Sequence, residues 1–184
     1  MDIVTVKGDI EVCEVENGSD LTRFIKLPFD LYRDDPNWVP PLISERKEFF
    51  DRRKNPFFRA AKTRLFLARR HGQYVGRIAT CVNFNHNEYH HEEVGFFGFF
   101  DVINDYEVAD VLFKVAMITI KGEGMKRMIG PASFSTNHEV GMLVDGYDLP
   151  PAVMMPYNKP YYNDLVEKFG LKKVKDLLAY HIDQ

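Results

Sequence analysis

Apolar residues recur along the chain with two periods, and the period predicts which segments are helices and which are strands. In residues 21–29 the spacing of three and four places the apolar side chains on one helical face, which carries Leu21, Phe24, Ile25, Pro28 and Phe29. We expect Pro28 to bend or break this helix, because proline has no backbone N–H to donate. Ahead of it, residues 10–15 predict a strand, Asn17-Gly18 a turn, and Ser19 or Asp20 a helix cap.

A later helix is predicted by a second apolar stripe, which consists of Val108, Val111, Leu112, Val115 and Ala116. Asn104 and Glu107 have the spacing of a capping box, in which two side chains satisfy backbone N–H groups at the start of a helix. Gly122 and Gly124 are expected to end this helix.

Alternating and aromatic segments predict the strands. Residues 64–83 contain two apolar runs around a turn at residues 71–73, which is typical of a β-hairpin. Residues 94–100 read as an aromatic strand, and Met128-Ile129 starts a short one. Residues 165–171 predict a last helix ending in Gly170, followed by an apolar strand that closes the chain at Leu177, Leu178 and Tyr180.

The remaining segments follow neither period clearly. Residues 34–41 are rich in proline and predict an ordered loop with Trp38 as its anchor, and residues 42–53 fit a short helix. Residues 83–93 are polar. Residues 130–161 form a long irregular connection rich in proline, glycine and asparagine, and its length and apolar content favour a functional role.

This order of elements predicts an α/β (α+β) fold, a mixed sheet with helices packed on it, in a single domain over residues 1–184. Hydrophobic residues make up 45% and charged residues 28% of the chain, as in globular proteins. The net charge of -3 argues against nucleic acid or an anionic membrane as a partner. Only Cys13 and Cys81 are present and the N-terminus has no basic leader or apolar core, so we expect a reducing, cytoplasmic setting. No apolar run reaches about 18 residues, so no membrane span is expected.

Two polar clusters carry candidate chemistry. His86 and His90 have the spacing of two zinc ligands on a helix, but no third ligand is close in sequence, so we favour a solvated loop and expect no metal site. His138 or Glu139, in the irregular connection, has the chemistry of a general base acting on an amine. A role as ordinary loop polar groups is an equal alternative.

The chain resembles the GNAT superfamily of acyl-CoA-dependent N-acyltransferases, and in particular a poorly characterised GNAT-like branch. The hairpin at residues 65–79, the aromatic strand, the Gly122-Glu123-Gly124 helix end and the helix end at 165–171 carry this resemblance over residues 11–182. It implies a mostly antiparallel sheet with a splay between the fourth and fifth strands. The cofactor, acetyl-CoA or a longer acyl-CoA, would lie in the splay against Phe99, Phe100, Asp101 and Val102.

The turn after the aromatic strand departs from the family pattern. That turn normally contains glycines, whose backbone N–H groups hold the pyrophosphate of CoA at a helix N-terminus. Here residues 101–110 contain no glycine, and Asp101, Asp105, Glu107 and Asp110 surround the turn. Each charge-assisted hydrogen bond is worth roughly 1.5 to 3 kcal/mol, so losing two weakens binding by about a hundredfold or more. We therefore predict weak CoA binding.

The catalytic acid of the family is often a tyrosine four residues before the glycine of the last helix, and this chain has Val166 there. Tyr161 and Tyr162, one turn earlier, are the candidates for that role, although packing is the more common role for such aromatic residues. Met142, Met154 and Met155 suit an apolar acyl chain and equally an ordinary core.

Two functions follow from the resemblance. The first is acyl transfer to an amine acceptor, either a small molecule or a peptide. The alternative is a non-catalytic binding or scaffold domain that forms the N-terminal half of a tandem protein, as in the Fem peptidyltransferases. In that case residues 180–184 would be the edge that meets a second GNAT-like domain or another copy in a homodimer.

Overall fold

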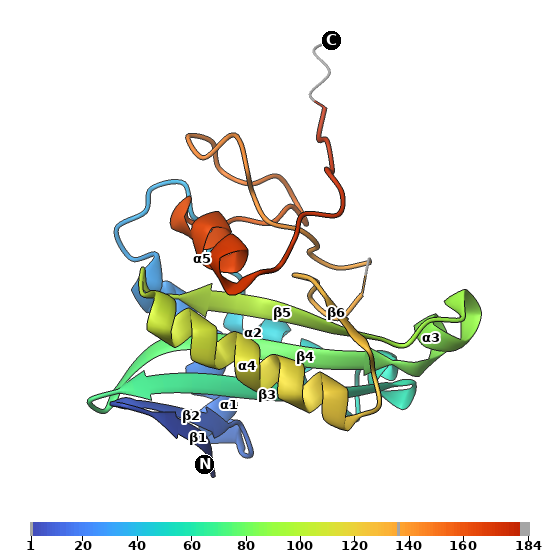
Figure 1. Ribbon diagram of the computed structural model, residues 1–184. Coiled ribbons are helices and arrows are strands. Elements are labelled where there is room, and N and C mark those ends of the chain that lie inside the picture. The colour runs from blue at the N-terminus through green and yellow to red at the C-terminus, as the bar shows by residue number, and fades with distance from the viewer. Residues whose placement is uncertain (1, 136, 181–184) are drawn as a thin grey trace.

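A six-stranded sheet forms the centre of the computed structural model, which describes residues 2–135 and 137–180 (Figure 1). The strands follow one another across the sheet in chain order, and all neighbours are antiparallel except β5 and β6. They are β1 (Ile3–Lys7), β2 (Ile10–Glu14), β3 (Ala61–Arg70), β4 (Gln73–Asn83), β5 (Val94–Val102) and β6 (Arg127–Ile129). The predicted mixed, mostly antiparallel sheet is confirmed, with β1 as an additional strand that the sequence pattern did not indicate.

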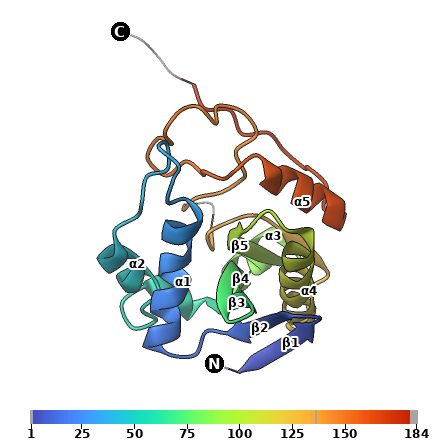
Figure 2. The ribbon, with the colours of Figure 1, turned by 90° about the vertical axis from the view of Figure 1, so that its left-hand side faces the viewer.

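Helices cover both faces of this sheet. They are α1 (Gly18–Leu31), α2 (Ile43–Phe49), α3 (Phe84–His90), α4 (Tyr106–Gly122) and α5 (Tyr161–Phe169), with a 3₁₀ turn, η1, at Pro56–Arg59. Figure 2 shows α1 and α2 on one face, α4 on the other, and α5 above the β5 side of the sheet. Within the described residues, no helix is both long enough and apolar enough to cross a bilayer.

Pro28 lies inside α1, so the break that was one of the two predicted effects does not occur. A proline at this position leaves the carbonyl of Phe24, four residues earlier, without its helical N–H donor. The guanidinium of Arg77 donates to that carbonyl instead, with an Nη1–O distance of 2.7 Å. Because the freed acceptor has a buried charged partner, the helix continues to Leu31.

Several predicted boundaries also shift. Asn17, not Ser19 or Asp20, caps α1, and Asp105, not Asn104, caps α4, in each case through its side-chain oxygen. The helix expected over residues 42–53 is the shorter α2. Residues within the polar segment form α3, where a loop was predicted, because Asn83 caps it and His91 ends it in the left-handed conformation. Gly170 ends the last helix as expected, but α5 begins at Tyr161.

The predicted closing strand is wrong for the described residues, because 171–180 form neither helix nor strand. The apolar side chains that suggested it are exposed, with Leu177 at 58%, Leu178 at 73% and Tyr180 at 81%. They have no neighbouring strand to pair with, since β6 is only three residues long. Residues 181–184, part of the expected docking edge, lie outside the described residues.

The expected splay is present between β5 and β6, which are the fifth and sixth strands here because of β1. The two strands pair only where Val94–Phe96 meets Arg127–Ile129. Beyond this point a narrow loop, joined by a bridge between Ala132 and Val140, approaches β5. The Ala132 N–H donates to the carbonyl of Phe97 at 2.7 Å. We call residues 132–140 the crossing loop.

Candidate functional site

A bulge in β5 marks the centre of the candidate site. The pairing of β4 with β5 runs through Ala79 opposite Gly98 and then Arg77 opposite Asp101, so Phe99 and Phe100 together oppose one residue of β4. Phe99 has φ +46°, a conformation rare for a bulky residue. A bulge leaves one residue outside the ladder, and it therefore frees backbone groups at this point of the strand.

An open cavity of about 160 Å³ lies against the bulge, next to Phe99, Phe100 and Asp101. Its other polar side chains are Arg46, Arg77, Ser133, Glu139, Tyr157, Asn158 and Tyr162, and its apolar ones include Trp38, Val39, Pro41, Met142, Pro151, Met155 and Pro156. Asp101 and Ser133 are buried, whereas Val39 is 58% and Met155 38% exposed. The cavity therefore has buried polar groups among aromatic side chains at its base and exposed apolar side chains at its opening, which suits a ligand with a polar head and an apolar chain.

Asp101 and Arg77 form a buried ion pair at the base of the cavity. Nε and Nη2 of Arg77 both lie 2.7 Å from Oδ2 of Asp101. Each side chain is only 12% exposed, and Arg77 also lies over the rings of Phe24 and Phe99. A buried charge pair of this kind requires its remaining acceptors and donors to be satisfied as well.

Tyrosines from two helices meet the end of β5. The Tyr162 hydroxyl accepts from the backbone N–H of Val102 at 3.0 Å, and the Tyr161 hydroxyl donates to the carbonyl of Val102 at 2.7 Å. The Tyr32 hydroxyl lies 3.2 Å from Oδ1 of Asp101 and 3.1 Å from the Tyr162 hydroxyl. Burial raises the pKa of Tyr161 to about 12 and raises the pKa of Tyr162 further. Burial and the charge of Asp101 also raise the pKa of Tyr32, so all three phenols are neutral at ordinary pH.

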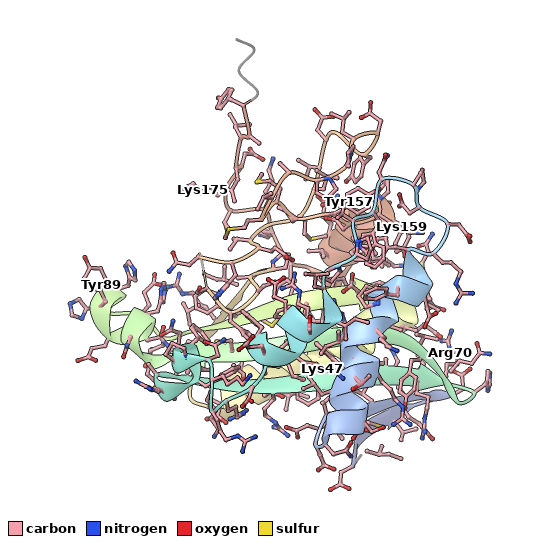
Figure 3. The ribbon with its side chains drawn as sticks, turned by 180° about the vertical axis from the view of Figure 1, so that it is seen from behind. Lys47, Arg70, Tyr89, Tyr157, Lys159 and Lys175 are labelled. Carbon is pink, nitrogen blue, oxygen red and sulfur yellow. The ribbon has the colours of Figure 1, made fainter. Side chains whose placement is uncertain are left out.

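The aromatic wall beside this cluster comes from the segment after α1 and from residues ahead of α5. The ring of Tyr32 stacks on Trp38, and the Tyr157 hydroxyl donates to Asp35 at 2.8 Å. Figure 3 shows Tyr157 and Lys159 close to the light-blue segment that follows α1. The Lys159 ammonium lies 5.5 Å from the centre of the Tyr32 ring.

Glu139 reaches the cavity from the crossing loop and forms an ion pair with Arg46 of α2. His138 does not line the cavity. Its ring packs edge-on against Phe49 and Phe57, and its Nδ1 lies 2.8 Å from the Ser135 hydroxyl. Burial, followed by the charge of Arg46, lowers the pKa of His138. The structure thus separates the two candidate bases, and only Glu139 faces the cavity.

The start of α4, where the resemblance places a pyrophosphate, is filled by the chain's own side chains. Asp105 accepts from the N–H groups of Glu107 and Val108 at 2.8 and 3.4 Å. Arg70 donates to Asp105 at 2.7 Å and to Glu107 at 3.3 Å. Burial alone would raise the pKa of Asp105, but the bonds from Arg70 and the backbone outweigh it and lower the pKa. Asp105 is therefore ionised, and both carboxylates are paired with Arg70.

The histidines of α3 lie near the start of β5, whereas the cavity lies near the end of that strand (Figure 1). The rings of His86 and His90 are 4.4 Å apart, and His86 lies 3.4 Å from a carboxylate oxygen of Glu92. Across residues 2–135 and 137–180, no three His, Cys, Asp or Glu side chains are arranged to hold a metal ion.

Of the candidate catalytic and cofactor-binding residues from the sequence, five line one cavity: Phe99, Phe100, Asp101, Glu139 and Tyr162. Trp38, Met142 and Met155 line it too, whereas Val102, His138 and Tyr161 do not. Sequence reasoning missed Tyr32, Arg46 and Arg77. Two of them carry a readable signal, because Arg77 is a charge inside an apolar strand and Tyr32 follows Pro28 by four residues on the helical stripe.

The architecture matches solved acetyltransferases over almost the whole chain. One is an aminoglycoside acetyltransferase from an uncultured soil metagenomic sample in complex with sisomicin, with a TM-score of 0.55, 12% identity, and coverage of 96% of this chain and 97% of that one. Another is an acetyltransferase of Clostridium acetobutylicum with acetyl-CoA, with a TM-score of 0.54, 11% identity, and coverage of 94% and 96%. Glucosamine-6-phosphate N-acetyltransferase from Arabidopsis thaliana matches with a TM-score of 0.52, 12% identity, and coverage of 95% and 99%. The chain therefore has the fold of the GNAT N-acyltransferases.

Sequence comparison adds two curated relatives. Protein YghO of Escherichia coli (strain K12) is 41% identical over 164 residues, which are 89% of this chain and 42% of that protein. Bacterial ceramide synthase of Caulobacter vibrioides (strain NA1000 / CB15N) is 38% identical over 181 residues, which are 98% of this chain and 47% of that protein. The chain thus spans less than half the length of either relative. No family model matches it.

Proposed function

We propose that this domain transfers an acyl group from acyl-CoA to the amine of an acceptor that carries an apolar chain. The amine nitrogen attacks the thioester carbonyl carbon, a C–N bond forms, and the C–S bond breaks. The electron pair of that bond leaves with the thiolate of CoA, and the amine loses one proton to a base. The products are an amide and CoA.

The observation that carries this proposal is the cavity at the β5 bulge, on a fold whose solved examples include an enzyme with acetyl-CoA bound. Backbone N–H groups freed by a bulge are suited to stabilise the oxygen of a tetrahedral intermediate. The apolar opening suits an alkyl chain. A relative is named a bacterial ceramide synthase, and a ceramide is the amide of a long-chain amino alcohol with a fatty acid. We therefore propose a long-chain amine as acceptor and a fatty acyl-CoA as donor.

Glu139, which is paired with Arg46, is the base in this proposal, because it lines the cavity and His138 does not. It would accept the one proton that the neutral amine nitrogen loses as the C–N bond forms. His138 stays the alternative base. An acid role for Tyr161 or Tyr162 also stays a prediction, but both hydroxyls are engaged by Val102, which favours a role in holding β5.

The proposal is tested by measuring thiol release from acetyl-CoA and palmitoyl-CoA with a panel of amines, including a long-chain amino alcohol and glucosamine. We expect palmitoyl-CoA with the long-chain amine to be the fastest pair. Glu139→Gln should lower kcat/KM by about a hundredfold or more if the carboxylate is the base. Glu123→Gln is the matched control, since Glu123 also pairs with a cation, Lys62, but lies at the end of α4. Equal activity in both variants would reject the assignment.

A second function, ligand binding without catalysis as one half of a longer protein, is favoured by two observations. Asp105 and Arg70 fill the start of α4, and the backbone groups of Val102 are both occupied by tyrosines. A second GNAT-like domain or a second copy would then complete the site. Trp38, the single tryptophan of the chain, lines the cavity and reports binding by fluorescence. A response to the long-chain amine, with no heat of binding for acetyl-CoA or palmitoyl-CoA in calorimetry, would support this second function.

A further inference from the structure

Four side chains in the interior form a connected set of hydrogen bonds. The set starts and finishes at the two residues of β5 that directly follow the bulge. The four side chains come from four elements: Tyr32 directly after α1, Arg77 of β4, Asp101 of β5 and Tyr162 of α5. Tyr32 and Tyr162 are each 1% exposed. Residues distant in sequence are thus joined at two consecutive residues of one strand, Asp101 and Val102.

The donors and acceptors of this set can be ordered. Oδ2 of Asp101 receives both contacts from Arg77, so Oδ1 is left to accept from the Tyr32 hydroxyl at 3.2 Å. The Tyr162 oxygen accepts from the Val102 N–H. Each hydroxyl has one proton to donate, and the proton of Tyr32 is used on Asp101. Tyr162 therefore donates to the oxygen of Tyr32, which lies 3.1 Å away. With this order every group has a partner, and the bonds polarise one another in the same direction.

Apolar packing fixes the rings that carry these hydroxyls. Tyr32 stacks on Trp38 with the ring planes 13° apart, and Tyr162 meets Phe100 of the bulge with centroids 5.5 Å apart. Tyr32 is therefore held by the cavity wall on one side and bonded to the end of β5 on the other. Its only polar group is directed at the strand.

From this arrangement, and resting on the proposed function, we propose that Tyr32 is a positioning residue that holds the bulge of β5 in its reactive geometry through Asp101 and Tyr162. It acts on the strand and needs no contact with substrate. Removing its hydroxyl should therefore slow the chemical step, because a small displacement of the bulge misplaces the groups around the thioester.

Tyr32→Phe removes only the oxygen and keeps the ring. We expect kcat to fall about tenfold, KM for palmitoyl-CoA to stay within about twofold, and the pH profile of kcat to keep its shape. Tyr32→Phe with Tyr162→Phe should lose little more than Tyr32→Phe alone, because both changes break one connected set. Tyr147→Phe is the matched control, since the Tyr147 hydroxyl also donates a hydrogen bond, to the carbonyl of Leu143 at 2.6 Å, but Tyr147 does not line the cavity.

Several results would overturn the proposal: equal losses in Tyr32→Phe and Tyr147→Phe, an effect confined to KM, or a shifted pH profile, which would make Tyr32 a proton donor. Amide hydrogen exchange supplies a readout that does not depend on turnover. The Val102 amide should exchange about tenfold faster in Tyr32→Phe, with Ile78 of the β3–β4 ladder unchanged. An inactive wild-type domain would reject the proposed function; a faster Val102 amide would then still support the hold on β5, and an unchanged one would overturn it.

Discussion

Gly98 is the position at which a single methyl group should damage the candidate site most directly. A Cβ added there would lie 1.9 Å from the carbonyl oxygen of Ala132, and contacts under 3.0 Å force atoms apart. The atom in the way is backbone, in the crossing loop that carries Ser133 and Glu139 into the cavity. Gly98→Ala must therefore push this loop away from β5.

The cost can be worked from the contacts that change. Overpacking of a tight interior costs about 1 to 3 kcal/mol, and loss of the bond from Ala132 N–H to Phe97 adds about 0.5 to 1.5 kcal/mol. We expect the free energy of unfolding to fall by about 3 kcal/mol. For a domain of this size that lowers Tm by about 6 to 12 °C. Thermal unfolding followed by circular dichroism measures the shift, and Trp38 fluorescence measures the loss of amine binding.

Gly122→Ala supplies the control, because a Cβ there meets no atom within 4 Å and the residue ends α4. It should leave stability unchanged or raise it by up to about 1 kcal/mol. If Gly98→Ala melts within about 2 °C of the wild type and binds the amine normally, the crossing loop is not held against β5 at Gly98.

Three further predictions concern titratable groups. Burial alone would raise the pKa of Asp110, but hydrogen bonds from lysines 114 and 7 lower it. The ionised carboxylate therefore stabilises the fold above about pH 4, and this contribution is lost as the pH falls through the lowered pKa. Asp110→Asn should accordingly destabilise the protein in urea by about 1 to 2 kcal/mol at pH 7, with the difference shrinking below about pH 4. Burial raises the pKa of Cys81 to about 12, so in Cys13→Ser its thiol should resist Ellman's reagent at pH 8 until urea is added. The NMR titration midpoint of His138 should lie below 6.5 and rise in Arg46→Gln, since burial and then Arg46 lower its pKa; an unchanged midpoint would contradict this.

The parts of the fold that depend on local periodicity could be predicted from the sequence. The β3–β4 hairpin follows from alternation around a tight turn, in which His71 and Gly72 both have positive φ. The stripe of α4 and the glycine stop after α5 were equally clear. Short elements were harder: α3 depends on a cap from Asn83, and β1 was recognised only by its pairing with β2.

The candidate site was predictable only in part, because its geometry depends on contacts between distant segments. The sequence indicated β5 as the wall of the site and residues 138 and 139 as possible bases. It did not show which of the two side chains turns inward. Nor did it show that Pro28 leaves a carbonyl for Arg77, which requires α1 and β4 to be packed together. The closing strand failed for the same reason, since a strand needs a neighbour that local sequence does not supply.

The sheet and the cavity depend on different kinds of contact. The sheet is built largely from strands that follow one another in the chain, whereas the cavity joins distant segments. From β1 to β5 every neighbouring pair is consecutive in the chain, and tight turns join β1 to β2 and β3 to β4, so these local contacts form rapidly. The cavity instead needs Trp38, the crossing loop and Tyr162 to come together across more than a hundred residues. We therefore expect the cavity to form after these local pairings and to open while the sheet stays folded. A ligand that spans base and opening would draw these late segments together, and in that way binding itself would complete the folding of the domain.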